Sequence, residues 1–452
     1  MQEKHTNTKN LTEGSPWRLL LLFSLPLMAG NVFQQLYTVV DTAVVGKALG
    51  VEALAALGVV DWQNWMMLGI IQGFTQGFSI LMAQKFGEGD TKGLRLVVGN
   101  SIVLSLVCGV LLTIVSQLTT EPIIGLLDAP KEIRPISTAY LRVLFSGLPV
   151  VMAYNLAASI LRSLGNGKQP LFAMIVASVT NIVLDLLFVL GFGWGVQGAA
   201  AATIIAQCFS AGYCIWHLCK IPELHLAGED LRVDGTLSVR LMKLGLPMAF
   251  QNTVISVGGM IVQTIVNGFG VIFIAGFTAT NKLYGVLEVA ATSYGYAMTT
   301  YAGQNFGAGK RERIAKGMRS GLTIAMITSV IITVFMFLLG RQILSCFISA
   351  DAGQSEQALD IAVRYLRIMA FFLPVLYVLH ITRSCIQGLG NTILPMVSGI
   401  SEFVMRTGAS LLLPILFGET GILFAEILAW FGADLILVPG YLWVMRRIRM
   451  GR

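Results

Sequence analysis

Asp185 occupies the position in this sequence that most needs a chemical explanation. It lies near the middle of residues 171–191, an apolar run long enough to cross a lipid bilayer as one helix. An aspartate at the centre of such a helix costs roughly 2.5–3.5 kcal/mol, so this carboxylate is expected to face water, a partner or a bound ion rather than lipid. Asn181 precedes it by four residues, which places both side chains on one face of the helix. The two residues predict a polar site inside the membrane.

Other ionisable side chains also fall within apolar runs. Lys282 and Glu288 are six residues apart, about 240° around a helix, so they cannot pair with each other and each needs another partner or an aqueous cavity. Glu402 and Arg406 are four residues apart and are predicted to pair along their helix. Glu288 is therefore a further candidate to face a cation, whereas the sequence assigns no role to Glu426.

The composition is typical of a membrane protein with many spans. The chain has 452 residues, of which 55% are hydrophobic and only 12% charged, and its mean hydropathy is +0.74. Apolar runs of about eighteen residues or more predict twelve transmembrane helices, at 17–41, 52–80, 96–118, 135–160, 171–193, 197–219, 241–267, 271–300, 318–339, 362–384, 393–416 and 420–445. The first run is too long for a cleaved signal peptide, so we expect it to remain as the first span.

The distribution of Lys and Arg predicts the orientation. With the N-terminus in the cytoplasm, 22 of the 31 basic residues lie in the N-terminal tail, the even-numbered loops and the C-terminal tail. Seven lie on the other side, and only Lys282 and Arg406 are left within spans. This bias predicts a multi-pass protein of the cell (inner) membrane with both termini in the cytoplasm. The net charge of +7 then reflects topology and contact with anionic lipid, and it gives no reason to expect nucleic-acid binding.

The sequence repeats itself once. AQKFGEGD at 83–90 recurs as GQNFGAGK at 303–310, each between the end of a long apolar run and a basic loop. Pro26 in SLPLMAGN corresponds in the same way to Pro247 in GLPMAFQN, and the offsets of the matching landmarks stay between 220 and 225 residues. The chain is thus predicted to be a tandem duplication of one six-helix unit.

The duplication predicts the domain organisation. We expect an amino-terminal lobe at 1–220, a charged cytoplasmic linker at 221–235 and a carboxy-terminal lobe at 236–452. Because six spans return the chain to its starting side, both lobes enter the membrane in the same direction and are related by a pseudo-two-fold axis along the membrane normal. The space between such lobes can open to either side by rocking, which is the architecture of a transporter.

Residues for other kinds of chemistry are scattered. Six cysteines lie in or beside apolar runs without a CxxC motif, and four histidines are too far apart in the sequence to suggest a metal site. GQNFGAGKR at 303–311 differs from a phosphate-binding loop in its spacing, and Arg311 stands where Ser or Thr is required. The sequence therefore predicts neither an enzyme nor a bound cofactor.

The motifs resemble those of a known family. AQKFGEGD with GQNFGAGK, PLMAGNVFQQLYTVVDTAVVG in the first span and NIVLDLLF in the fifth look like the multidrug and toxic compound extrusion (MATE) family over essentially the whole chain. The resemblance implies an all-α integral membrane fold of twelve helices in two lobes, and antiport of organic cations against H⁺ or Na⁺. The branch similar to DNA-damage-inducible protein F has an amino-lobe cation site that is matched here by Asp41, Asn181, Asp185 and Thr203.

Two further residues match that branch, whereas two later spans lack the acidic residues of another branch. Pro26, where the first span can bend, and Gln34 also match its pattern. The runs 241–267 and 362–384 contain no acidic residue. The carboxylates that another branch keeps in these two spans for Na⁺ therefore have no counterpart in this chain.

These residues give a hypothesis for the mechanism. Asp185 with Asp41 binds the coupling ion, H⁺ or alternatively Na⁺, and protonation and cargo binding exclude one another at the carboxylates. The cargo route is expected to be bordered by Gln34, Tyr37, Asn155 and Glu288. The expected function is secondary active export of amphipathic, often cationic drugs by a monomeric transporter.

Two other functions stay open on the sequence. A lipid-linked-oligosaccharide flippase of the same superfamily would need Arg and Lys for the pyrophosphate, and only Lys282 and Arg406 lie within spans. A membrane-embedded transferase would need clustered His or Asp near one face, and it leaves the duplication unexplained. Both rank behind the antiporter.

Overall fold

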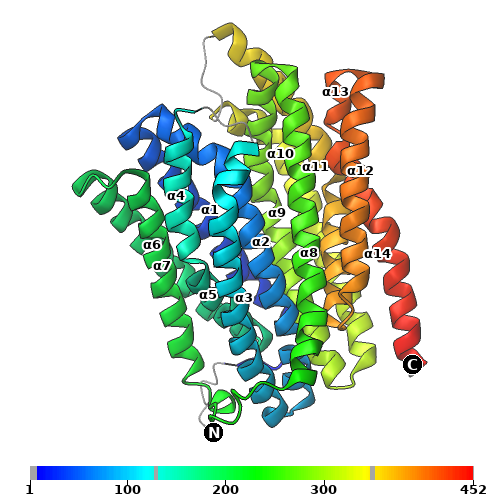
Figure 1. The fold of residues 1–452 in the computed structure, drawn as a ribbon. Coiled ribbons are helices and arrows are strands. Elements are labelled where there is room, and N and C mark those ends of the chain that lie inside the picture. The colour runs from blue at the N-terminus through cyan, green and yellow to red at the C-terminus, as the bar shows by residue number, and fades with distance from the viewer. Residues whose placement is uncertain (1–7, 127–130, 347–351, 451–452) are drawn as a thin grey trace. The chain divides into compact units, whose positions relative to one another are not determined.

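Helices make up almost all of the protein, as expected from the sequence. The structure, a computed structural model, describes residues 8–126, 131–346 and 352–450 (Figure 1), and within these ranges no strand occurs. The first helices are α1 (Pro16–Leu49), α2 (Val51–Glu88), α3 (Thr91–Leu126), α4 (Arg134–Ser146), α5 (Leu148–Ser163), α6 (Lys168–Asp185), the π-helix η1 (Leu186–Gly191), α7 (Gly195–Leu218) and the short η2 (Pro222–Leu224). They are followed by α8 (Gly235–Val266), η3 (Asn267–Phe269), α9 (Val271–Gly307), α10 (Arg311–Ser345), α11 (Ala352–Gly388), α12 (Ile393–Phe417), α13 (Glu419–Ile422) and α14 (Ala425–Arg449).

Each of the twelve predicted spans falls on one helix or on two consecutive helices. Ten helices in the described ranges are long and apolar enough to cross a membrane, and α4 with α5 makes an eleventh if the 48° bend between them lies inside one span. The bend follows from Pro149 near the start of α5, because proline cannot donate the backbone hydrogen bond that a continuous helix needs. The remaining predicted span, 271–300, lies on α9. This helix has 37 residues but is interrupted by polar side chains such as Lys282 and Glu288.

The described helices divide into two compact units. Unit 1 contains residues 8–12 and Leu25–Ala249, and unit 2 contains Glu13–Ser24 and the chain from Phe250 onward. In unit 1, α6 packs against α7, while α5 packs against α2, α3 and α7 (Figure 1). In unit 2, α11 packs against α9 and α10, and α12 packs against α14. The lobe boundaries predicted from the repeat, at 220/221 and 235/236, stay a prediction.

The division between the units runs through α1 and α8. It lies between Ser24 and Leu25 in α1 and between Ala249 and Phe250 in α8, beside Pro26 and Pro247 respectively. The two prolines are the equivalent positions of the sequence repeat. Each removes one hydrogen bond from the interior of its helix, so both helices are locally weakened where they pass from one unit to the other.

Unit 1 contains a close contact between helix backbones. Gly73 and Gly77 form a GxxxG motif on α2. A Cβ on Gly73 would overlap the backbone of Ala249, and a Cβ on Gly77 would overlap that of Gly245, both in the first part of α8. Small residues at this spacing let two helices approach without side chains between them, which is a common way to pack helices in a membrane.

Candidate functional site

The buried carboxylate expected from the sequence lies at a local change in helix geometry. Asp185 is the last residue of α6, and the chain continues directly as the π-helix Leu186–Gly191. The side chain of Asp185 is completely buried, at 0% exposure. Single π-turns in longer helices are frequent at functional sites, and the sequence did not predict this one.

Asn181 is oriented by the neighbouring helix. It lies one turn before Asp185, is 1% exposed, and donates from Nδ2 to Thr203 Oγ1 over 3.4 Å. Thr203 comes from α7, and its hydroxyl donates in turn to the Ala199 carbonyl at 3.1 Å. Because the amide nitrogen of Asn181 is engaged with Thr203, its oxygen is left for another partner.

Asp41 brings a second carboxyl group to Asp185. It lies on α1, which approaches α6 closely enough for the Ser178 hydroxyl to lie 3.5 Å from the Phe33 carbonyl. The carboxyl groups of Asp41 and Asp185 lie within electrostatic range of each other. Two carboxyl groups can form a hydrogen bond only when one of them holds a proton. The pair is therefore built to carry a proton or another positive charge.

The oxygen atoms around this pair lack hydrogen-bond donors. Asp41 Oδ1, Asn181 Oδ1 and both carboxylate oxygens of Asp185 are buried and accept no hydrogen bond from the described part of the protein. Buried polar atoms in proteins are nearly always satisfied, so a group of donor-free oxygens favours a bound proton or cation. Carboxylate, amide and hydroxyl oxygens are the ligands that hard cations prefer. The residues thus fit H⁺ or Na⁺.

Two tyrosines lie in the electrostatic field of the carboxyl pair. Tyr37 precedes Asp41 by one turn of α1 and is within Coulombic range of both carboxyl groups. Tyr140 of α4 is also within range of both, although the sequence gave no reason to single it out. Tyr37, predicted to border the cargo route, thus lies close to the carboxyl pair.

The other predicted cargo residues are not seen at this pair. Asn155 on α5 donates from Nδ2 to the Val151 carbonyl of its own helix at 2.8 Å. Gln34 is half-buried on α1, and within the described ranges no contact of its side chain with either carboxyl group is recorded. Glu288 belongs to unit 2, where it takes part in a separate polar network.

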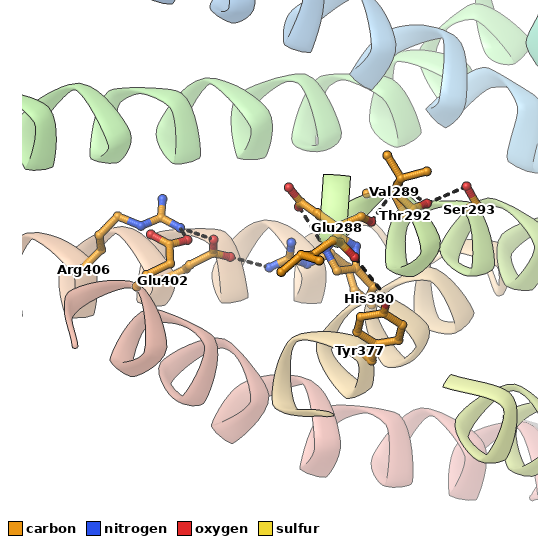
Figure 2. A network of polar contacts seen from close by, with 11 residues as sticks. Glu288, Val289, Thr292, Ser293, Tyr377, His380, Glu402 and Arg406 are labelled. Atoms are coloured by element: carbon orange, nitrogen blue, oxygen red, sulfur yellow. Dashed lines mark hydrogen bonds and ion pairs between the residues drawn. The ribbon is translucent and has the colours of Figure 1, made fainter. Parts of the chain in front are cut away.

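That network begins with a contact between a glutamate on α9 and a histidine on α11, which is an ion pair when the imidazole is protonated. Glu288 Oε1 lies 3.3 Å from His380 Nε2, and Figure 2 shows the two side chains facing each other. The Glu288 backbone carbonyl accepts from the Thr292 hydroxyl at 3.2 Å. On the other helix, the Tyr377 hydroxyl donates to the Leu287 carbonyl at 3.1 Å, which fixes α11 against α9 beside the pair.

Buried charges on α11 and on two further helices, α12 and α14, continue the network. Arg383 of α11 lies 2.7 Å from Glu402 of α12, and Glu402 lies 2.9 Å from Arg406 one turn later (Figure 2). Arg406 also lies 2.6 Å from Glu426 of α14. The side chains of Arg383, Glu402 and Arg406 are at most 10% exposed. These charges are therefore stabilised by pairing with one another rather than by hydration.

The network confirms one prediction and corrects another. Glu402 and Arg406 do pair along their helix, as their spacing predicts. Arg383, one of the 22 basic residues assigned above to the cytoplasmic side, is instead buried inside α11 at 8% exposure. Lys282, counted as a basic group within a span, is exposed at the surface of unit 2. The sequence did not predict a role for His380 or Arg383, because their partners lie on other helices. The only sign of a site was the presence of two polar residues three apart in an apolar run.

The described residues offer no clustered metal site. Within 8–126, 131–346 and 352–450, no group of three or more His, Cys, Asp or Glu side chains could hold a metal ion. The four candidate cation ligands of unit 1 include only two carboxylates, Asp41 and Asp185, and complete their oxygen set with an amide and a hydroxyl. Such a set suits a proton or a singly charged hard cation better than a transition metal.

Comparison with known proteins identifies the family. A sequence model of the MatE family matches residues 26–187 and again residues 247–412. The chain belongs to the MatE family. The two matches begin at Pro26 and Pro247, the equivalent positions of the internal repeat, so the family model matches this MatE chain once in each half.

Curated relatives and solved structures agree with this assignment. The chain is 28% identical to the probable multidrug resistance protein YpnP of Bacillus subtilis over 91% of its length and 92% of the relative's. It is 26% identical to the probable multidrug resistance protein NorM of Thermotoga maritima, over 84% and 81%. It shares its fold with the outward-facing conformation of a multidrug resistance MATE family transporter of the MOP superfamily, with a TM-score of 0.89, 24% identity and 99% coverage of both chains. The fold is thus the twelve-helix, two-lobe MATE architecture that the sequence predicts.

Proposed function

We propose that this MatE chain is a secondary active transporter that exports amphipathic, often cationic small molecules in exchange for H⁺ or Na⁺. The names of its relatives support multidrug efflux as the direction and class of transport. The observation that carries the coupling is the set of four buried oxygens of Asp41, Asn181 and Asp185 that receive no donor from the described protein, with the two carboxyl groups in electrostatic range of each other.

The coupling follows from competition at these carboxyl groups. Two carboxylates that share a buried site repel each other and are poorly solvated, so the site binds a proton or a cation in preference to remaining doubly charged. An organic cation can neutralise the same charge, and then the coupling ion is no longer required. Binding of one therefore weakens binding of the other, which is the linkage that an antiporter needs. Alternating access would come from rocking of the two duplicated halves.

The proposal includes a place for the protein in the cell. The bias of Lys and Arg supports a multi-pass protein of the inner, cytoplasmic membrane with both termini in the cytoplasm. A transport cycle of this kind needs no covalent chemistry and no bound cofactor, so we propose a transporter and not an enzyme. We propose a monomer, because one chain supplies both halves of the duplicated fold.

Transport in proteoliposomes tests the function. Purified protein is reconstituted, a pH gradient or a Na⁺ gradient is imposed alone, and movement of a fluorescent organic cation is followed. The wild type is expected to move the dye in response to at least one of the two gradients, and Asp185→Asn is expected to abolish this response. Asp360→Asn is the matched control, since Asp360 is exposed and paired with Arg341 at 2.9 Å. Full gradient-driven transport by Asp185→Asn would show that the assignment of this carboxylate is wrong.

No observation favours the flippase. A flippase would need free guanidinium groups for pyrophosphate, but Arg383 and Arg406 are both paired with glutamates in the described network. The same vesicles can nevertheless test it, because a flippase would move a labelled lipid-linked sugar and ignore the imposed ion gradients.

A further inference from the structure

The Glu288–His380 pair differs from the rest of the charged network in its exposure. Glu288 keeps 33% of its side-chain surface exposed and His380 keeps 16%. Glu402 and Arg406, in contrast, keep 6% and 5%. Glu426 of the same network is 20% exposed, but it is paired with Arg406. Glu288 is therefore the most exposed carboxylate of the described network.

The charges around the pair are already matched with one another. Arg383 is taken by Glu402, and Arg406 by Glu402 and Glu426. In the described part of unit 2, the only side chain recorded in an ion pair with Glu288 is His380. Whether the Glu288 charge is neutralised thus depends on whether the imidazole holds a second proton.

The ionisable groups within electrostatic range of Glu288 or His380 come from four helices. They are Tyr284 on α9, Tyr377 on α11, Glu402 on α12 and Glu426 on α14. Arg383, Arg406 and Asp434 lie beyond them, within range of Glu402 or Glu426. The two guanidinium groups are balanced by Glu402 and Glu426, so the surroundings add no net positive charge that would satisfy Glu288.

We propose that Glu288 and His380 form a second, carboxy-terminal binding site for organic cations, which a proton on His380 closes. When the imidazole is neutral, the Glu288 carboxylate lacks a cationic partner and attracts a cation. When the imidazole is protonated, it forms the ion pair itself and excludes the cation. The site lies within unit 2 and does not use Asp41 or Asp185.

The surroundings indicate the class of cation. Tyr284 lies one turn before Glu288 on α9 and stacks on Trp430 of α14 with a centroid distance of 6.0 Å and an interplanar angle of 20°. Trp430 is buried, at 1% exposure, so only the half-buried Tyr284 ring can meet a ligand at Glu288. An aromatic ring beside a single carboxylate suits a large, weakly hydrated organic cation through cation–π attraction. A small hard cation would instead need several oxygen ligands, and the pair provides one carboxylate. This inference rests on the proposed function for the kind of cargo, and on the geometry of unit 2 for its position.

Binding of tetraphenylphosphonium to the purified protein in detergent tests the proposal. This cation does not titrate, so any effect of pH belongs to the protein. Between about pH 5.5 and 8.5, the range in which imidazole changes charge, the wild-type affinity is expected to fall as the pH falls. His380→Gln should bind with the high-pH affinity throughout, and His380→Arg should bind about tenfold more weakly at every pH. Because the two variants change binding in opposite directions, misfolding cannot produce both results.

Three controls separate this site from the rest of the molecule. Glu288→Gln should weaken binding about tenfold, whereas Glu121→Gln at an exposed glutamate should not. His217→Gln should keep the wild-type pH profile, because His217 lies on α7 in unit 1. The same series is repeated in the Asp185→Asn background, in which the amino-terminal carboxyl pair no longer competes for the cation. The effects of the Glu288 and His380 variants should persist there although gradient-driven transport is lost, so failure of the proposed function can be told apart from failure of this site.

The result that overturns the proposal is equally specific. A His380→Gln protein with the wild-type pH profile, or a Glu288→Gln protein with wild-type affinity, would exclude the site. Absence of measurable binding by the wild type would exclude it as well.

Discussion

Gly77 of α2 and Gly245 of α8 meet backbone to backbone, and a Cβ on Gly77 would overlap the Cα of Gly245. Nothing flexible separates the two helices at this point, so an added methyl group can be accommodated only if a helix moves. We predict that Gly77→Ala lowers the free energy of unfolding by about 1–3 kcal/mol, the usual cost of overpacking. Thermal unfolding in detergent, followed by tryptophan fluorescence, measures this change.

Gly212 provides the matched control for Gly77. It also lies inside a helix, α7, but a Cβ there would meet nothing within 4 Å. Gly212→Ala is therefore expected to leave the melting temperature unchanged or to raise it, because alanine favours the helix by about 1 kcal/mol. Equal melting temperatures for the two variants would mean that the close contact of α2 with α8 does not support the fold.

The buried network of unit 2 leads to a second prediction about stability. Arg406 holds both Glu402 and Glu426, and Arg406→Met leaves Glu426 without a cation. Removing one partner of a buried ion pair costs about 3–5 kcal/mol, so we expect a large drop in the midpoint of thermal unfolding. Neutralising the stranded acid with Arg406→Met/Glu426→Gln should recover part of the loss.

An exposed ion pair supplies the comparison for Arg406. Arg142 lies 2.6 Å from Glu121, but the two side chains are 55% and 64% exposed. Arg142→Met is expected to cost at most about 1 kcal/mol, because exposed ion pairs are weak. If Arg406→Met were no more harmful than Arg142→Met, the network would have no structural role.

The sequence predicts those parts of the sites that lie on one helix. Asn181 with Asp185, and Glu402 with Arg406, are both four residues apart, and the helix period alone places each pair on one face. Spans are predictable for a similar reason, because an apolar run of sufficient length must become a helix in the membrane. The recurrence of Pro26 as Pro247 indicated the duplication, and the duplication predicted the two-lobe arrangement of these spans.

Contacts between helices could not be predicted in the same way. His380 and Glu288 are separated by more than ninety residues, and their meeting depends on how α11 packs against α9. The burial of Arg383 near the end of its span depends likewise on Glu402 from α12. The proximity of Asp41 to Asp185 was reached through the family resemblance, since no local rule joins residues on α1 and α6.

The loop between α2 and α3 gives a prediction about pH. Lys85 Nζ lies 2.8 Å from Asp90, and Asp90 Oδ1 accepts from the Gly93 amide at 2.8 Å. The Lys85 ammonium, followed by the Gly93 amide, lowers the pKa of Asp90 below its usual value. Because the folded pKa is the lower one, this stabilisation is complete above the unfolded pKa of about 3.9 and is lost as the pH falls through the folded value.

Two variants separate the charge of Asp90 from its capping role at α3. Asp90→Asn keeps a capping oxygen but loses the charge, so its melting temperature should fall less than that of the wild type as the pH is lowered from about 6 to 3. Asp90→Ala loses the cap as well and should be about 1 kcal/mol less stable even at neutral pH. Parallel acid profiles for wild type and Asp90→Asn would contradict this account.

Asn181 allows H⁺ coupling to be distinguished from Na⁺ coupling. A proton needs only one carboxylate oxygen, whereas Na⁺ as a hard cation draws on several oxygen ligands. The Asn181 oxygen is buried and receives no donor from the described protein, so it is available to a metal cation. We predict that Asn181→Leu weakens Na⁺-driven dye transport at least about tenfold, and that it affects H⁺-driven transport much less.

Everted vesicles with one ion gradient imposed at a time measure both responses. Thr203→Val tests the support for Asn181, because it removes the hydroxyl that accepts from Asn181 Nδ2 at 3.4 Å while keeping the shape of the side chain. Thr119→Val is its control, since the Thr119 hydroxyl donates only within its own helix, to the Val115 and Ser116 carbonyls. If Asn181→Leu and Thr203→Val reduce both gradient responses equally, the amide does not select the ion and acts only by holding Asp185 in position. If they leave both responses intact, coupling depends on the two carboxyl groups alone, and the oxygen set around Asp185 is no cation site.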